Sequence, residues 1–465
     1  MRETTIMRSL PLTLALAAGA VAPLAAQRAL APSPGTPKSF HLAAARSFAL
    51  PNGLEVTLVP FGTIPKAHVR LVLRSGNINE KASEVWLADL TGAMLSEGTT
   101  TRSAAQLAED FAGMGGEFAV NVGLDVTSLV TEVLGERAPE AIRLVAEVAQ
   151  RPALPASELA RLKADKLRDL SIQKSQPQPV AQEAFAKTLY GNHPYGRIFP
   201  TEAQLQGYTI EQVRGFWSAN AGAARSHLYV TGVFDQKAVE QAIRDAFQGW
   251  KRGPAPLQLP PAPSTKRTLV LLDRPKAPQS TIYMGLPVAN PTSKDWIGLR
   301  VTDALLGGSF GSRITSNIRE QKGYTYSPYS FVAPHVKDAY WNEVADVTTE
   351  HTGESITEIL REIGRLQKEA PSSAELRGIQ NYLSGIFTIQ NSSRAGIASQ
   401  LQFANLHGLG TGYLTSYVDN VMKVTPGEVQ TLAQRYIDPS RMTIVVVGDK
   451  AIVEEQLRPF QAAVP

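Results

Sequence analysis

The second half of this chain repeats the first, and this repeat is the strongest constraint that the sequence places on the fold. A helix-like segment is followed by an arginine and then by a buried strand that ends in glycine, once near residues 209–232 and again near 425–448. A constant offset over such segments predicts two copies of one domain of about 210 residues each. The matching pairs all lie 216 residues apart: Thr209 and Thr425, Val213 and Val429, Arg225 and Arg441, and Gly232 and Gly448.

A proline-rich segment separates the two copies. Gly253–Ser264 reads GPAPLQLPPAPS, in which five of the twelve residues are proline. Proline fixes φ and lacks an N–H donor, so this stretch is predicted to be a semi-rigid linker. We therefore expect a first domain at 47–252, a linker at 253–266 and a second domain at 267–463.

Local patterns within the copies mix strands with helices. Asn52-Gly53 between two alternating apolar stretches predicts a hairpin, and Ser103 with Gln106 forms a capping box that begins a helix. Glu117–Val133 is typical of paired strands, whereas Pro139–Ala149 is an amphipathic helix. The predicted fold class is α+β, with a mixed, mostly antiparallel sheet packed against helices in each domain.

Composition excludes several classes of protein. Of the 465 residues, 43% are hydrophobic and 19% charged, which is ordinary for a globular protein. The net charge of +4, without a run of five like charges, gives no reason to expect a nucleic-acid partner. Because the chain has no cysteine, disulfides, thiolate metal sites and cysteine nucleophiles are all excluded.

The N-terminus has the pattern of a secretory signal peptide. Arg2 and Arg8 precede the apolar stretch Leu10–Leu24, and small residues follow up to Ala26. We expect a leader at 1–26, a flexible lead-in at 27–46, and an exported, periplasmic protein. The alternative is a transmembrane anchor, which would keep the protein membrane-associated, but the stretch is short for a spanning helix.

Several motifs resemble the M16 zinc peptidases, the family of insulinase, pitrilysin and the mitochondrial processing peptidase. Asn192-His-Pro-Tyr-Gly-Arg197 and Met94-Leu-Ser-Glu-Gly-Thr99 resemble segments of its N-terminal domain, and so does Gly115-Gly-Glu-Phe-Ala. Leu306–Arg313 through Arg319–Ser327 is similar to its C-terminal domain. The resemblance covers the chain from about Phe48 and implies two homologous M16-type domains that form a clamshell.

The catalytic motif of that family is degenerate in this chain. In His-x-x-Glu-His, two histidines one helical turn apart bind zinc and the glutamate activates water. Aligned on Met94–Thr99, the motif positions hold Asp89, Gly92 and Ala93, and the distant third ligand falls near Asp169. One or two carboxylates without imidazole form a poor zinc site, so no metal and no cofactor are expected in this chain.

Two other kinds of site are weaker alternatives. None of the seven histidines has another histidine three to five residues away, so we interpret them as isolated surface, strand or turn residues, with His193 structural. Gly307-Gly-Ser309-Phe-Gly311 matches the G-x-S-x-G pattern of serine hydrolases. That elbow requires a strand before the serine, whereas Trp296–Leu306 has helical periodicity.

The resemblance also assigns a role to Arg319 and Tyr326. In similar M16 proteins an arginine and a tyrosine of the C-terminal domain bind the substrate backbone, and both residues are present here. The alternative is that Arg319 forms a surface ion pair and Tyr326 is a core aromatic residue. Family members also use the strand after the Gly-Gly pair, here 117–125, to bind peptide, and the sequence does not separate this role from ordinary strand pairing.

These expectations favour a non-catalytic, substrate-binding subunit of an exported M16 peptidase. Such a chain would be inactive alone and would contribute to peptide hydrolysis only with a partner that carries His-x-x-Glu-His and the zinc. Whether the chain also pairs with itself stays open. The rival hypothesis is an M16-fold scaffold or binding protein without any role in peptide hydrolysis.

Overall fold

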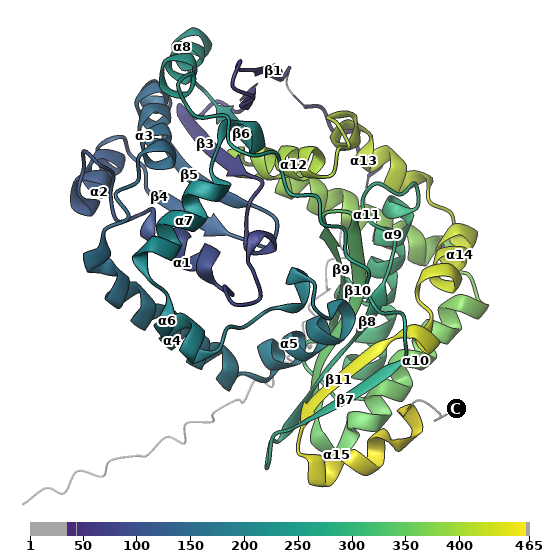
Figure 1. Ribbon diagram of the computed structural model, residues 1–465. Helices are drawn as coiled ribbons and strands as arrows, with labels where there is room; N and C mark the ends of the chain where they lie inside the picture. Colours follow the sequence, from purple (N-terminus) through teal and green to yellow (C-terminus); the bar gives the residue numbers. More distant parts are fainter. Residues whose placement is uncertain (1–34, 43, 462–465) are drawn as a thin grey trace, which may run out of the picture. The chain divides into compact units, whose positions relative to one another are not determined.

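The computed structural model describes residues 35–42 and 44–461, and these residues belong to one unit from Pro37 onward. The predicted leader at 1–26 lies outside the described residues. The sequence repeat appears as two sheets, one in each half of the chain (Figure 1). No helix in the described ranges is long and apolar enough to cross a membrane.

The first sheet has six strands in the order β1-β2-β6-β3-β5-β4. The predicted hairpin at Asn52-Gly53 joins β1 to β2, and Gly53 has a φ of +97°, which glycine adopts without strain. All pairs are antiparallel except β2 with β6. The strands are β1 Arg46–Ala49, β2 Glu55–Pro60, β3 Lys66–Leu73, β4 Phe118–Val122, β5 Thr127–Leu134 and β6 Ser226–Gly232.

The helices of the first half begin where polar caps predict them. Ser103 accepts a hydrogen bond from the Gln106 amide at the start of α2, so the predicted capping box is confirmed. Thr209 does the same for Gln212 at the start of α7. The helices are α1 Leu87–Met94, α2 Ala104–Gly113, α3 Ala138–Gln150, α4 Leu159–Ser175, α5 Pro177–Tyr190, α6 Glu202–Gly207, α7 Ile210–Asn220 and α8 Gln236–Phe247.

The second sheet repeats the first, without a counterpart of β1. Its order is β7-β11-β8-β10-β9, and β7 with β11 is the one parallel pair among its described strands, as β2 with β6 is in the first sheet. The strands are β7 Thr268–Asp273, β8 Gln279–Pro287, β9 Tyr329–His335, β10 Asp338–Thr348 and β11 Thr443–Gly448. The helices are α9 Trp296–Leu306, α10 Thr352–Lys368, α11 Ser373–Gln390, α12 Arg394–Leu406, α13 Gly412–Lys423, α14 Pro426–Tyr436 and α15 Lys450–Leu457.

The two halves exchange one helix each, which the sequence did not predict. Helix α5 of the first half packs on β8 and β11 of the second sheet, and α12 of the second half packs on β3 and β6 of the first (Figure 1). Ile397 and Leu401 of α12 are buried in one apolar cluster with Val72 and Tyr229 of the first sheet. Burying a leucine or isoleucine side chain contributes about 1.5–3 kcal/mol, so each exchanged helix stabilises the half that receives it.

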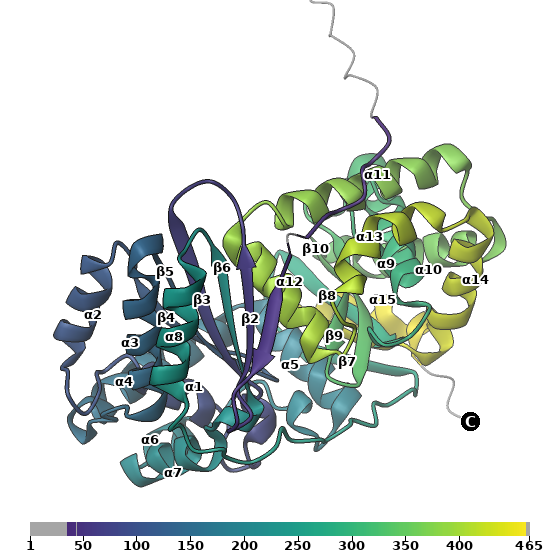
Figure 2. The same cartoon turned by 90° about the horizontal axis from the view of Figure 1, so that it is seen from above.

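Part of the predicted flexible lead-in lies against the second half. Ser39 donates a hydrogen bond to Asp419 of α13, and the Phe40 ring meets the edge of Phe387 of α11 with 5.4 Å between ring centres. The segment is visible along these helices in Figure 2. Residues 39–40 of the predicted lead-in therefore make specific contacts with α11 and α13.

Candidate functional site

Arg319 and Tyr326 are neighbours at the surface of the second half. Arg319 belongs to a π-helical segment, Thr315–Gln321, and such segments occur often at functional sites. After this segment the chain turns back, and Thr325 forms an isolated bridge with Val347 of β10. This return places the Tyr326 ring 5.1 Å from Cζ of Arg319, measured to the ring centre.

A third residue, Phe310, completes this cluster. Its ring centre lies 4.3 Å from Cζ of Arg319, within the range of a cation–π contact. The Phe310 and Tyr326 side chains are both solvent-accessible, with 71% and 78% of their surface exposed. The two rings on this guanidinium face solvent rather than the core, and we call these three residues the Arg319 cluster.

The glycines before Phe310 hold its loop against the protein. A Cβ atom at Gly307 would lie 2.5 Å from Oε2 of Glu343, and one at Gly308 would lie 2.7 Å from Oδ2 of Asp303. Only glycine permits so close an approach, which fixes the loop at its base and leaves Phe310 projecting. Phe310 is a site residue that the sequence motifs did not indicate, although an aromatic residue within a glycine-rich loop is a signal for an exposed ring.

The structure bears on each part of the alternative interpretation of this pair. The interpretation of Tyr326 as a core aromatic residue is wrong, because the side chain is mostly exposed. Arg319 does form a surface ion pair, with the adjacent Glu320 at 3.3 Å, its only ion pair among the described residues. Exposed pairs of this kind contribute little energy, so the guanidinium keeps donors for another group.

The serine-hydrolase alternative does not fit the geometry. Helix α9 ends at Leu306, so a helix precedes Ser309 where a nucleophile elbow requires a strand. The Ser309 side chain is buried, and its Oγ has no hydrogen-bond partner among the described residues. A buried hydroxyl without a base beside it is not an activated nucleophile.

The degenerate zinc motif lies on α1, and its one carboxylate is held by an amide. Asn77 Nδ2 donates to Asp89 at 2.7 Å and to Glu80 at 3.1 Å. Burial raises the pKa of Asp89, which the Asn77 hydrogen bond and the charge of Lys166 oppose. Burial also raises the pKa of Glu80 to about 8, although the Ala88 amide donates to it.

The remaining motif positions leave no room or ligand for a metal. A Cβ atom at Gly92 would lie 2.4 Å from Cγ2 of Val122, so strand β4 fills the space of a larger side chain. Asp169, near the predicted third position, pairs with Lys166 at 3.6 Å. A lysine ammonium acting on Asp89 disfavours a divalent cation there. Nowhere in residues 35–42 and 44–461 do three His, Cys, Asp or Glu side chains gather as metal ligands.

The histidines are less isolated than their spacing predicts. His193 and His335 approach Tyr195, with ring centres 4.6 and 4.3 Å away. His193 accepts from the Tyr195 amide, and its other nitrogen lies 3.0 Å from the Leu259 carbonyl oxygen of the linker. His193 therefore ties the linker to the first half.

Strand β4 forms one edge of the first sheet. Phe118–Val122 pairs with β5, and the described residues place no strand on its other side. Ala119 and Asn121 point to solvent, whereas Val122 packs against Gly92. The predicted strand 117–125 thus has an exposed edge beside the degenerate motif.

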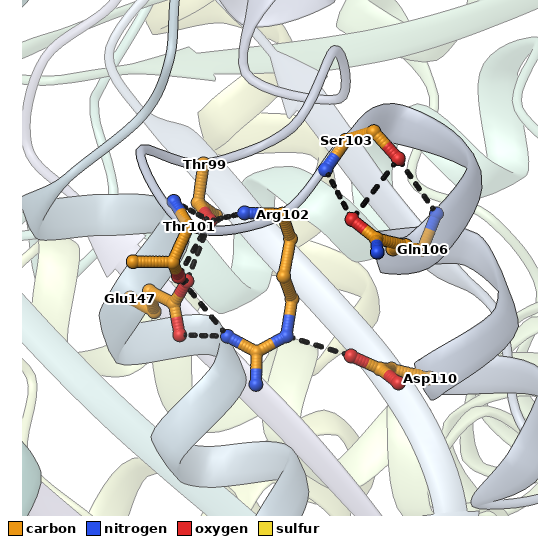
Figure 3. A network of polar contacts seen from close by, with 7 residues as sticks. All are labelled: Thr99, Thr101, Arg102, Ser103, Gln106, Asp110 and Glu147. Carbon is orange, nitrogen blue, oxygen red and sulfur yellow. Dashed lines mark hydrogen bonds and ion pairs between the residues drawn. The ribbon is translucent and has the colours of Figure 1, made fainter.

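A polar network fixes the chain that follows the motif (Figure 3). Arg102 forms ion pairs with Asp110 of α2 and Glu147 of α3, and Thr99 donates to Glu147 at 2.5 Å. The network joins the end of the Met94–Thr99 segment to two helices. It supplies no ligand toward Asp89.

The comparisons with known proteins match both halves of the chain. Residues 61–200 match the family described as insulinase (peptidase family M16), and residues 207–383 match the peptidase M16 inactive domain. This chain belongs to the M16 peptidase family. The first match contains Asp89, Gly92 and Ala93, whereas the second contains the whole Arg319 cluster.

Relatives and solved structures agree with the M16 assignment. Uncharacterized zinc proteases of Rickettsia felis and Bacillus subtilis (YmxG) are each 22% identical over 342 residues, which is 73% of this chain and 82% and 83% of theirs. A peptidase M16 inactive domain from Pseudomonas fluorescens superposes with a TM-score of 0.79 at 24% identity, covering 87% of this chain and 98% of that one. A protease from Helicobacter pylori superposes with a TM-score of 0.82 at 18% identity, covering 88% of this chain and 100% of that one.

Proposed function

We propose that this chain is the non-catalytic, substrate-binding subunit of an exported M16 peptidase. In this proposal, the Arg319 cluster binds the peptide backbone, and a partner chain with His-x-x-Glu-His supplies the zinc and the water-activating glutamate. The observation that carries the proposal is the cluster of Arg319 with the exposed rings of Phe310 and Tyr326. It is present in a chain in which Val122 occupies the space beside Gly92 of the degenerate motif.

The chemistry of the cluster suits a peptide. Arg319 offers a planar set of N–H donors to carbonyl oxygens, and the Tyr326 hydroxyl offers one more. Two rings over the guanidinium restrict its orientation, which lowers the entropy lost when a ligand binds. The exposed edge of β4 provides main-chain groups for an extended peptide.

The test is purification of the tagged mature protein from its native host, followed by mass spectrometry and reconstitution. A stoichiometric partner with His-x-x-Glu-His should co-purify, and the pair should cleave casein-derived peptides that neither chain cleaves alone. Arg319→Ala and Tyr326→Phe should lower kcat/KM of the pair by at least tenfold without weakening assembly.

Matched controls are available in the same half. Arg361 is an exposed arginine on α10 paired with Glu358, and Tyr382 is a half-exposed tyrosine on α11. Arg361→Ala and Tyr382→Phe should leave cleavage unchanged. Full activity of a complex whose subunit carries both Arg319→Ala and Tyr326→Phe would contradict the proposal. A stable complex that never cleaves peptides would favour the scaffold role.

A further inference from the structure

The second sheet has a hollow of about 500 Å³ where helix α5 begins, and no role in the M16 assignment accounts for it. Helix α5 covers the central part of one face of this sheet, but its first turn leaves the end of that face open. Tyr283, Tyr329, Phe331 and Asp346 form the floor, and Pro177, Gln178 and Gln182 form the wall. We call this hollow the α5 groove.

The groove adjoins the Arg319 cluster. Tyr329 follows Tyr326 by three residues. Thr325, next to Tyr326, donates from Oγ1 to the main-chain oxygen of Asp346 at 2.7 Å. Three residues span at most about 11 Å, so one extended peptide at the Arg319 cluster is long enough to reach the groove as well.

Asp346 gives the groove an uncompensated negative charge. Its carboxylate accepts hydrogen bonds from Gln178 Nε2 at 2.6 Å and from the Thr281 hydroxyl, both neutral donors. It forms no ion pair within the described part of the chain, and no other charged residue lines the groove. Arg274 donates to the Ser175 carbonyl at 3.0 Å and is not part of the lining.

The start of α5 does not supply the missing positive charge. A helix N-terminus attracts anions through its free N–H groups. Here Pro177 occupies the first helical position and Pro179 the third, so two of these donors are absent. The groove is therefore poorly suited to a carboxylate and suited to a cation.

The aromatic side chains strengthen that preference. Tyr329 and Phe331 stack with 5.9 Å between ring centres, and Tyr329 is 42% exposed. The faces of such rings attract ammonium and guanidinium groups, and the ring surface covers the methylene groups of a long side chain. We infer that the α5 groove binds a lysine or arginine side chain of the peptide held at the Arg319 cluster.

This inference rests on the proposed function for its peptide, but the groove is testable alone with small probes. The probes are the N-acetyl methylamides of lysine, norleucine and glutamate, titrated into the full mature chain and followed by NMR. The lysine probe should bind about three- to tenfold more tightly than norleucine, and glutamate should bind most weakly. Asp346→Asn should abolish the preference for the lysine probe over the norleucine probe. Tyr329→Ala should weaken the binding of both of these probes.

Arg319→Ala separates the two proposals. It should leave binding of the lysine probe unchanged, but it should weaken binding of a nine-residue alanine peptide with a central lysine at least fivefold. Equal binding of lysine and norleucine, tighter binding of glutamate, or a lysine preference that survives Asp346→Asn would overturn the groove assignment. Unchanged binding of the nine-residue peptide to Arg319→Ala would instead contradict the proposed function. Unfolding temperatures of both groove variants should confirm that they remain folded.

Discussion

A Cβ atom at Gly92 would lie 2.4 Å from Cγ2 of Val122. Helix α1 therefore lies closer to edge strand β4 than any residue larger than glycine at position 92 would allow. The motif alignment predicts that this position corresponds to the glutamate that activates water in M16 enzymes with an intact motif. Val122 occupies the space that a glutamate at position 92 would need. The two positions are expected to be energetically coupled.

Restoring the glutamate should destabilise the protein. Gly92→Glu forces Val122 aside, and overpacking of this kind costs about 1–3 kcal/mol. Val122→Ala in the same chain should recover part of that loss, which a double-mutant cycle by urea denaturation would measure. Gly113→Glu is the matched control, because no atom lies within 4 Å of a Cβ built there. If Gly92→Glu were no less stable than Gly113→Glu, the packing argument would be wrong.

Phe310 should contribute to peptide binding but not to folding. Its side chain is mostly exposed, so Phe310→Ala is expected to change the unfolding temperature by little. The loss of its contact with Arg319, about 0.5–1 kcal/mol at an exposed site, should raise KM of the reconstituted pair two- to fivefold. Phe310→Trp keeps an aromatic face for the Arg319 guanidinium, so its KM should stay at or below the wild-type value, whereas Phe310→Leu should raise KM as Phe310→Ala does. Equal KM values for wild type and Phe310→Ala would remove Phe310 from the site.

Glu80 should make stability depend on pH. Its pKa is about 8 in the folded protein against 4.5 for a free glutamate, so the folded state holds a proton that the unfolded state releases. The stabilisation linked to this proton is complete below pH 4.5 and is lost as the pH rises toward 8. Relative to Glu80→Gln, the wild type should lose on the order of a few kcal/mol between pH 5 and pH 8.

The control for this effect is Glu109→Gln on the exposed face of α2. It should shift the stability curve equally at all pH values. Chemical denaturation at pH 5, 6.5 and 8 would measure the three proteins. A wild type that is as stable at pH 8 as at pH 5, relative to Glu80→Gln, would show that Glu80 is ionised in the folded state.

The sequence predicted local structure well, because caps and periodicity are local signals. Thr209 and Thr425 cap equivalent helices, and the hairpin at Gly53 follows from its turn residues. Which sheet a helix covers is not a local property, so the exchange of α5 and α12 could not be predicted from apolar spacing alone. The contact of Asn77 with Asp89 links residues twelve positions apart around a short helix, and nothing in the motif indicated it.

Within the candidate site, the pairing of Arg319 with Tyr326 came from family resemblance, and the geometry added Phe310. The role of Phe310 depends on exposure, which is set by the close approach of Gly307 and Gly308 to buried carboxyl groups. No spacing rule contains that information. The same holds for Asp346, which has no cationic partner among residues 35–42 and 44–461, a fact that appears only once the surrounding side chains are placed.

The exchanged helices predict that neither half folds alone. Separated at the linker, residues 47–252 would lack α12, which covers β3 and β6, and residues 267–461 would lack α5, which covers β8 and β11. Each fragment should be insoluble or molten when expressed alone, whereas co-expression should yield a soluble complex with cooperative unfolding. Arg394→Ala removes the 2.7 Å ion pair between α12 and Glu132. It should clearly lower the yield of the complex of the two fragments, but it should lower the stability of the intact chain only slightly. Two fragments that each unfold cooperatively in isolation would show that the exchanged helices are dispensable for folding.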